Sequence, residues 1–217
     1  MQSLGFLVLL YNITSWRDII ALTKVQIISG ALLQLGHAPV VSLTAGDPLV
    51  TAAEAAFDLL LPSVLSSGNW RFATQIQQLS LSTEIAPYPW KSVYLLPAGF
   101  LKTLRIWPQF YDWDIYQNER IFTNFQNEFY MEYVFQPDVS HLPSHFTDYF
   151  IYEISAFLAL SNAQSAPFYS VLEAKRIQKQ ALANAIETQN RPQFTNVDFP
   201  VLSLRVIGGI MGNSFNQ

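Results

Sequence analysis

Cysteine is absent from this sequence, and charged residues are scarce. Because none of the 217 residues is Cys, disulfides, thiolate nucleophiles and cysteine-based metal sites are excluded. Only 13% of the residues are Asp, Glu, Lys or Arg, whereas an average globular protein carries about a quarter. Half of the residues are hydrophobic, so a folded monomer would expose much apolar surface, which usually marks an interaction site. The composition therefore favours an oligomer.

Basic residues are few and form no cluster. The formal net charge is −4 and the isoelectric point is near 5.3, whereas a surface that grips nucleic acid needs clustered Lys and Arg. Among the three histidines, His141 and His145 have the spacing of zinc ligands on a helix. Pro143 lies between them, however, and a proline inside a helix removes a backbone hydrogen bond. We interpret this segment as a loop that leads into a helix, and we predict no metal site.

Signatures of catalysis are also missing. There is no glycine-rich phosphate loop and no Gly-x-Ser-x-Gly turn. Asp112 and Asp114 alternate within a predicted strand, so both carboxylates could face one way as an acid/base pair beside Tyr111, Trp113 and Tyr116. No further polar group converges on them, so we predict no catalytic residue, no cofactor and no enzymatic activity. A carbohydrate-acting or carbohydrate-binding protein built on this patch is kept as an alternative.

The first ten residues are apolar but do not have the features of a signal peptide. A basic leader is missing, and Tyr11 to Thr14 interrupt the apolar run. The run is also far shorter than the roughly 20 residues that span a bilayer. We interpret residues 1–17 as an N-terminal arm and predict no membrane association.

Helical periodicity occupies two regions on either side of the middle of the chain. In residues 18–35 apolar residues recur at steps of three and four, and Gly36 stands where a left-handed cap is common. Asp47 and Pro48 predict the start of a second helix, and Pro62 predicts a kink or break before Gly68.

Two more helices are predicted in residues 144–161 and 168–189. The apolar stripe of the third helix consists of Phe146, Phe150, Ile154, Phe157 and Leu160. In the fourth, the predicted inward seam consists of Val171, Ala174, Gln178, Ala181, Leu182 and Ala185. The charged face is predicted to be solvated, with Glu173, Arg176, Lys179, Gln180 and Glu187.

The middle of the chain has the pattern of short strands. Residues 70–82 alternate, and strands are predicted at 92–96, 103–107, 112–117, 119–124 and 129–136. Residues 190–217 lack the signals of a packed element. The sequence therefore predicts an α+β fold, in which a bundle of two N-terminal and two C-terminal helices (18–69 and 138–189) carries an inserted, mostly antiparallel β lobe (70–137). An extended C-terminal tail (190–217) follows.

Residues 22–73 carry a family resemblance. The first helix ends in Leu32-Leu33-Gln34-Leu35-Gly36, a loop with Pro39 and Ser42-Leu43 follows, and Gly46-Asp47 precedes an Ala-rich helix. Asn69-Trp70-Arg71-Phe72-Ala73 then opens the β lobe. This order resembles the opening of the tail tubular protein A family, the adaptors that join head to tail in short-tailed bacteriophages. Residues 94–101 and 129–138 are similar in a looser way, so the resemblance covers about residues 18–189.

The resemblance implies a structural ring subunit rather than an enzyme. The family places a dodecameric ring between the portal protein and the tail nozzle, and double-stranded DNA passes through its lumen without specific binding. The expected location is the neck of the virion, and the host cytoplasm during assembly. We expect the tail to order against the portal through Phe199, Val201, Leu202, Leu204, Val206 and Ile207. A head-completion protein of long-tailed phages, which is built on a similar helical bundle, stays open as an alternative.

Overall fold

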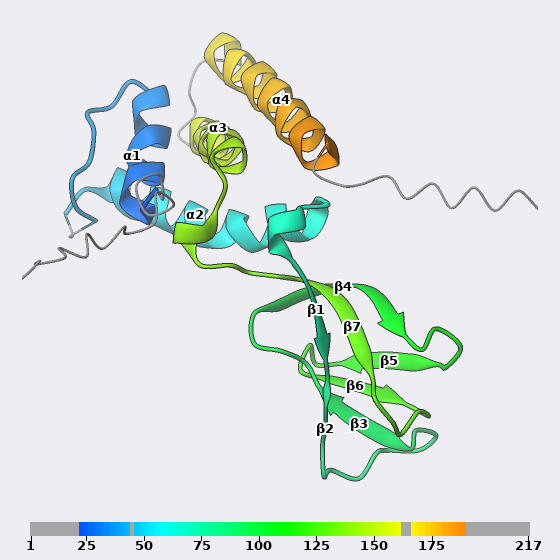
Figure 1. Ribbon diagram of the computed structural model, residues 1–217. Coiled ribbons are helices and arrows are strands. Elements are labelled where there is room, and N and C mark those ends of the chain that lie inside the picture. Colours follow the sequence, from blue (N-terminus) through cyan, green and yellow to red (C-terminus); the bar gives the residue numbers. More distant parts are fainter. Residues whose placement is uncertain (1–21, 44–45, 162–165, 190–217) are drawn as a thin grey trace, which may run out of the picture.

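The computed structural model describes residues 22–43, 46–161 and 166–189, and these ranges contain four α-helices and two antiparallel β-sheets. The protein is therefore mixed α and β. The helices come from the two ends of the described chain, and every strand lies between them in the sequence. In space, the strands form a lobe on one side of the helices (Figure 1).

The first helix, α1 (Lys24–Gln34), begins later than the sequence predicted. Thr23 caps it, because its side chain accepts a hydrogen bond from Gln26 N while the Gln26 side chain accepts one from Thr23 N. At the other end Gly36 has φ +83°, and His37 N–H donates to the carbonyl of Leu32. This left-handed cap was predicted correctly. The predicted helical residues 18–21 lie outside the described residues.

The second helix, α2 (Pro48–Ser67), begins at the predicted Asp47 cap but is not broken at Pro62. It continues for another turn to Gly68, where the chain turns toward the β lobe. A Cβ atom built on Gly68 would lie 2.2 Å from the indole Nε1 of Trp70, so only glycine fits there. That indole N–H donates to the carbonyl of Val64 at 2.9 Å, which fastens the start of the lobe to the end of α2.

The β lobe holds two antiparallel sheets. A 3₁₀ turn, η1 (Arg71–Ala73), replaces the first part of the strand predicted at 70–82. The strands are β1 (Thr74–Gln78), β2 (Ser80–Leu81), β3 (Ser92–Leu95), β4 (Phe100–Trp107), β5 (Trp113–Tyr116), β6 (Arg120–Thr123) and β7 (Tyr130–Phe135). One sheet has the order β1-β7-β4 and the other β2-β3-β6-β5. The last five of these strands lie where the sequence predicted strands, with boundaries shifted by up to three residues.

Two separate hydrophobic cores support the two regions. The larger core joins all four helices and receives Trp70, Ala73 and Val134 from the lobe. The smaller core lies within the lobe and contains Leu79, Tyr94, Phe100, Ile106, Ile121, Phe129, Met131 and Tyr133. Because β7 sends Val134 into one core and Tyr133 into the other, this strand connects the two regions.

After a second 3₁₀ turn, η2 (Val139–His141), the chain forms α3 (Ser144–Ser161) and α4 (Ala166–Gln189). The helix α3 contacts α1, α2 and α4, and it buries Phe146, Phe150 and Ile154 as predicted. Its last two stripe residues, Phe157 and Leu160, are 40% and 65% exposed, because at that level of the helix Leu158 and Ala159 face the core instead.

The predicted seam of α4 is wrong, because the helix packs in the opposite orientation. All six seam residues, from Val171 to Ala185, are exposed. The residues predicted to be solvated, from Glu173 to Glu187, are instead half-buried or buried. The physical reason is that α3 offers α4 the charged partners Asp148 and Glu153, and beside them the core buries Leu172 and Ala183 from the same side of α4.

Candidate functional site

The residues predicted to bind the portal do not belong to the described structure. Phe199, Val201, Leu202, Leu204, Val206 and Ile207 all lie in residues 190–217, outside the described residues. The candidate surfaces discussed here therefore come from the helices and the β lobe.

The aspartate pair that could have served a sugar-binding patch is exposed. Asp112 precedes β5 rather than lying within it, and the Asp114 carboxylate accepts a hydrogen bond from the neighbouring Ile115 N–H at 2.8 Å. Of the aromatic neighbours, Tyr111 packs on Phe125 with ring centroids 4.7 Å apart. The two carboxylates are thus solvated, and at least one neighbouring aromatic residue, Tyr111, packs within the lobe.

The two spaced histidines lie on different elements, as Pro143 led us to predict. His141 ends η2, whereas His145 lies in the first turn of α3. The His145 Nε2 atom is 2.6 Å from a carboxylate oxygen of Glu187. Within the described residues no group of three or more His, Asp or Glu side chains could hold a metal ion.

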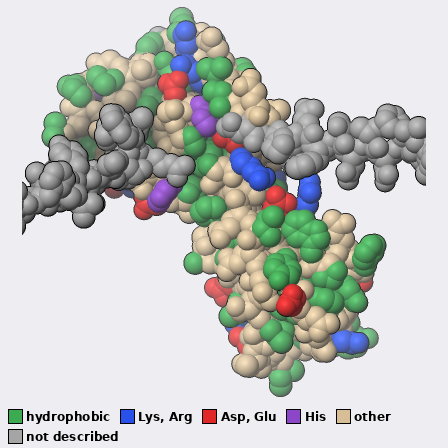
Figure 2. Space-filling view, viewed as in Figure 1, with side chains coloured by type: hydrophobic (Ala, Val, Ile, Leu, Met, Phe, Trp, Pro, Cys, Tyr) green, Lys and Arg blue, Asp and Glu red, His purple; other side chains and the backbone are tan. Residues whose placement is uncertain are grey.

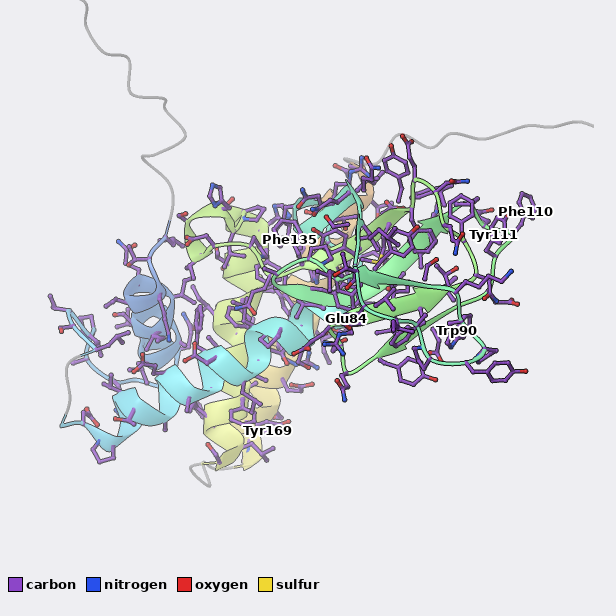
Figure 3. The ribbon with its side chains drawn as sticks, turned by 90° about the horizontal axis from the view of Figure 1, so that it is seen from below. Glu84, Trp90, Phe110, Tyr111, Phe135 and Tyr169 are labelled. Carbon is purple, nitrogen blue, oxygen red and sulfur yellow. The ribbon has the colours of Figure 1, made fainter. Side chains whose placement is uncertain are left out.

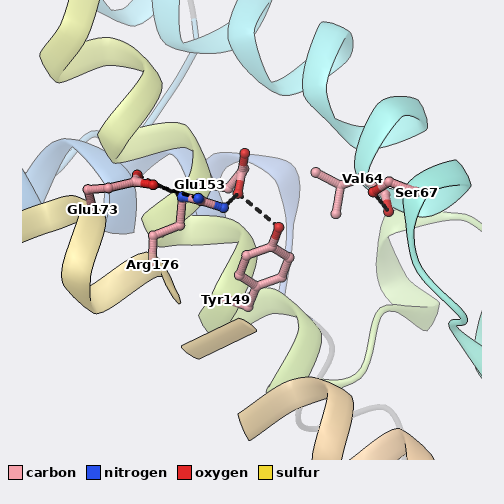
Figure 4. Close-up of polar contacts among 6 residues, drawn as sticks. All are labelled: Val64, Ser67, Tyr149, Glu153, Glu173 and Arg176. Carbon is pink, nitrogen blue, oxygen red and sulfur yellow. Dashed lines mark hydrogen bonds and ion pairs between the residues drawn. The ribbon is translucent and has the colours of Figure 1, made fainter. Parts of the chain in front are cut away.

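The inner face of α4 is held to α3 by a charged cluster centred on Arg176. Two guanidinium nitrogens of Arg176, Nε and Nη2, donate to the two carboxylate oxygens of Glu173, at 2.8 and 2.6 Å. The third nitrogen, Nη1, reaches Glu153 of α3 at 3.1 Å, and the Tyr149 hydroxyl donates to the same Glu153 oxygen at 2.8 Å (Figure 4). The fork-shaped guanidinium therefore joins two carboxylates from two helices.

Burial and charge tune the ionisable groups of this cluster. Burial raises the pKa of Tyr149 well above its usual range, and the adjacent Glu153 carboxylate raises it further. The Arg176 hydrogen bonds lower the pKa of Glu173. At neutral pH Tyr149 is therefore neutral and Glu173 is ionised, as their hydrogen bonds require.

A second polar tie holds the C-terminal end of α4 against the start of the lobe. Glu187 is only 7% exposed, and besides His145 it accepts a hydrogen bond from Arg71 N–H at 2.7 Å. Two shallow cavities of about 50 and 310 Å³ adjoin it, and both include Asn69 and Glu187 in their walls. Because Glu187 already has two partners, this tie is a joint between helix and lobe.

With its charges turned inward, α4 presents an apolar face to solvent. We call the exposed residues Val171, Ala174, Ile177, Ala181, Leu182 and Ala185 the α4 outer face. Val171, Ile177 and Leu182 are 59%, 53% and 54% exposed. Lys175 is the one charged residue among the exposed positions of α4. An amphipathic helix normally buries its apolar face, so the α4 outer face is an unusual exposed apolar patch.

The helix α2 also exposes an apolar face, lined by smaller side chains. We call Pro48, Ala52, Ala55, Leu59 and Ser63 the α2 outer face. This helix is long and apolar enough to cross a membrane by length and composition alone, although a third of its most apolar stretch is buried inside the protein. Apart from Leu59, its outer face has none of the large aliphatic side chains that lipid-facing positions favour.

Aromatic side chains gather at the end of the lobe farthest from the helices. Trp90, Phe110 and Tyr111 all lie at this end, as Figure 3 shows. Phe110 and Tyr88, another residue of the lobe, are 96% and 99% exposed. Hydrophobic side chains also spread over the visible face of the lobe in Figure 2. The lobe therefore has an apolar contact surface separate from those of the helices.

Sequence reasoning missed the polar inner face of α4, although a signal was present. Glu173, Arg176, Gln180 and Glu187 recur at helical steps that place them on one stripe. The preceding helix carries complementary groups in Asp148 and Glu153, and Lys179 pairs with Asp148.

In comparisons with known proteins, no family model and no curated protein sequence matches this chain.

Proposed function

We propose that this protein is a structural adaptor subunit of a phage neck. It forms a ring between the portal and the tail nozzle, and that ring lines the channel through which DNA is ejected. In this proposal the four helices are the bundle of the adaptor fold, formed by residues 18–69 and 138–189. The lobe of residues 70–137 is its insertion. Twelve copies would close the ring, and the protein would reside in the neck of the virion after assembly in the host cytoplasm.

The observation that carries the proposal is the distribution of exposed apolar surface. Large hydrophobic side chains are exposed on α4 and at the far end of the lobe, and α2 exposes Leu59 beside small side chains, in a chain with only 13% charged residues. A ring subunit of a connector needs several such surfaces, because it touches neighbouring copies on two sides and different proteins above and below.

Two further features support the proposal. The segment that carries the family resemblance, residues 22–73, is continuous in the fold. In it, α1, its left-handed cap at Gly36 and α2 lead to Trp70 at the start of the lobe. The net charge of −4 also suits a channel wall along which DNA slides without being held.

The test is to image the purified protein by negative-stain electron microscopy, alone and with the portal protein encoded in the same genome. Mass photometry of the same samples gives the number of copies bound. We expect an added ring on the portal with a mass increment of twelve subunits. If the protein neither forms a ring nor joins the portal, the proposal is wrong.

The portal contact is predicted to require the tail. Deleting residues 200–217 should abolish portal binding and leave the far-UV circular dichroism spectrum unchanged, since the deletion spares all described helices and strands. Undiminished binding of the truncated protein to the portal would remove the tail from the interface.

A further inference from the structure

The two outer faces lie on different sides of the helical region. The helix α3 contacts both α2 and α4 and lies between them (Figure 1). Each outer helix turns its buried face toward the shared core, so its outer face points away from α3. One copy of the chain therefore offers two different apolar faces in two different directions.

The two faces are complementary in shape. The α4 outer face has projecting side chains in Val171, Ile177 and Leu182, whereas the α2 outer face is lined mainly by Ala and Ser, which lets a partner helix approach closely. The helices have 24 and 20 residues, so they are about 36 and 30 Å long and match over most of their length.

The two faces are also complementary in charge. Lys175 is the one charged residue at the exposed positions of α4, and it makes no ion pair within the described part of the chain. Asp58 is the one charged residue at the exposed positions of α2, and its side chain stays 63% exposed while it bonds to Lys24. Because Lys24 joins Asp58 to Glu54 at the flank of α2, that side of the contact carries a net charge of −1, and Lys175 gives the α4 side a charge of +1. Opposite net charges favour this pairing over α4 with α4 or α2 with α2.

We infer that the α4 outer face of one copy packs against the α2 outer face of the next copy. Such a contact is head-to-tail, because it joins two different surfaces, and repeating it produces a closed ring when the rotation between copies closes. The inference rests on the proposed function only in taking the assembly to be a ring. The contact itself follows from the two faces.

The deciding experiment uses one charged variant for each face. Leu182→Glu adds a carboxylate to the α4 outer face and Ala55→Glu adds one to the α2 outer face. Leu81→Glu is the matched control, since Leu81 is 56% exposed in the lobe and Leu182 is 54% exposed. Analytical ultracentrifugation over a range of concentrations measures self-association. We expect the unmodified protein and the control to associate and each face variant to remain monomeric.

Mixing the two face variants tests the head-to-tail geometry. Each variant keeps one intact face, and these two intact faces are complementary, so an equimolar mixture should form a one-to-one dimer and nothing larger. If Ala55→Glu forms dimers by itself, α4 pairs with α4 and the inference is wrong. It is equally wrong if the unmodified protein remains monomeric or if both variants associate like the control.

Because the chain has no cysteine, a disulfide test is free of background. A chain carrying both Ala55→Cys and Ala181→Cys should give a ladder of oligomers on oxidation, whereas either single variant should give none. The disulfide measurement tests the same contact without the glutamate variants, so it remains decisive if one of them does not fold. A double variant that stays monomeric, or a single variant that dimerises, would count against the contact.

The outcomes separate this inference from the proposed function and from membrane binding. If the face variants still add a full ring to the portal, the adaptor function stands and the helix contact fails. If the protein self-associates through the two faces but never joins the portal, the contact stands and the adaptor function fails. Flotation of the unmodified protein with phosphatidylcholine–phosphatidylglycerol vesicles, lost in Ala55→Glu, would assign the α2 face to lipid and overturn the inference.

Discussion

The neighbouring helices α3 and α4 bury opposite kinds of surface. The helix α3 buries an apolar stripe with Phe146, Phe150 and Ile154 against three other helices. The helix α4 lies on the outside and contacts α3 through Arg176 and Glu187 as well as through the buried Leu172 and Ala183. It leaves most of its apolar residues in solvent. In a helix at the centre of a monomer, the most apolar stripe of the sequence is the side that is buried in the core. A helix at the edge can have its most apolar face reserved for a contact outside the monomer.

The largest expected effect tests the α3 side of this comparison. Phe150 is fully buried, and its ring packs edge-on against Phe57 at 5.3 Å. Phe150→Ala should therefore lower the free energy of unfolding by about 3–5 kcal/mol, through lost burial and the cavity left behind. Denaturant unfolding of the dilute protein, followed by circular dichroism, measures the change. A loss below 1 kcal/mol would mean that α3 is not the centre of the core.

A smaller effect is expected from the polar cluster of α4. Arg176→Met removes the guanidinium that joins Glu173 and Glu153 and leaves two carboxylates without their partner. The three side chains are between 20% and 29% exposed, so water offsets part of the loss. We expect the free energy of unfolding to fall by about 1–3 kcal/mol. An unchanged unfolding midpoint would show that α4 is held by its few buried apolar residues alone.

The same cluster predicts a pH dependence. The pKa of Glu173 is lowered below its ordinary value of 4.5 by the Arg176 hydrogen bonds, so near pH 4.5 the unfolded state binds more protons than the folded state. This contribution to stability is present above pH 4.5 and is lost as the pH falls through the lower folded pKa. Glu173→Gln should flatten this part of the stability profile. Parallel profiles for the two proteins between pH 3 and 6 would contradict the prediction.

The smallest effect is expected on the α4 outer face. Leu182→Ala removes a half-exposed side chain and keeps a good helix former, so the dilute protein should lose no more than about 0.5 kcal/mol. The contrast with Phe150→Ala sharpens the comparison, because similar losses at both positions would mean that Leu182 is buried in the monomer. Thermal unfolding at several protein concentrations is the appropriate measurement.

Much of the fold could be predicted from the sequence because local signals and packing agree. The Asp47 and Pro48 start of α2, the cap at Gly36 and the strands from β3 to β7 all follow from residue types with strong local preferences. The continuation of α2 through Pro62 could not be predicted in the same way. There, contacts of Leu61, Val64 and Leu65 with the core outweigh the missing backbone hydrogen bond.

The orientation of α4 could not be predicted from its periodicity. Periodicity locates an apolar face, but it does not say whether that face meets the same chain or another one. The charges of α3, in particular Glu153 and Asp148, together with the burial of Leu172 and Ala183, favour the side of α4 that turns inward. The predicted portal contacts at residues 199–207 lie outside the described residues and stay a prediction.

The position of Trp70, at the junction between the helices and the lobe, has a mechanical consequence. Because the lobe is an insertion, the described chain passes between the helices and the lobe twice, near Trp70 and in the segment that leads from β7 to α3. The Trp70 ring is wedged between Phe146 and Tyr149, and its N–H is tied to the end of α2. A load applied to the lobe tip therefore reaches the helices partly through this indole, together with the Arg71–Glu187 hydrogen bond and the packing of Val134. Trp70 would thus be displaced if the lobe tilted on the helices.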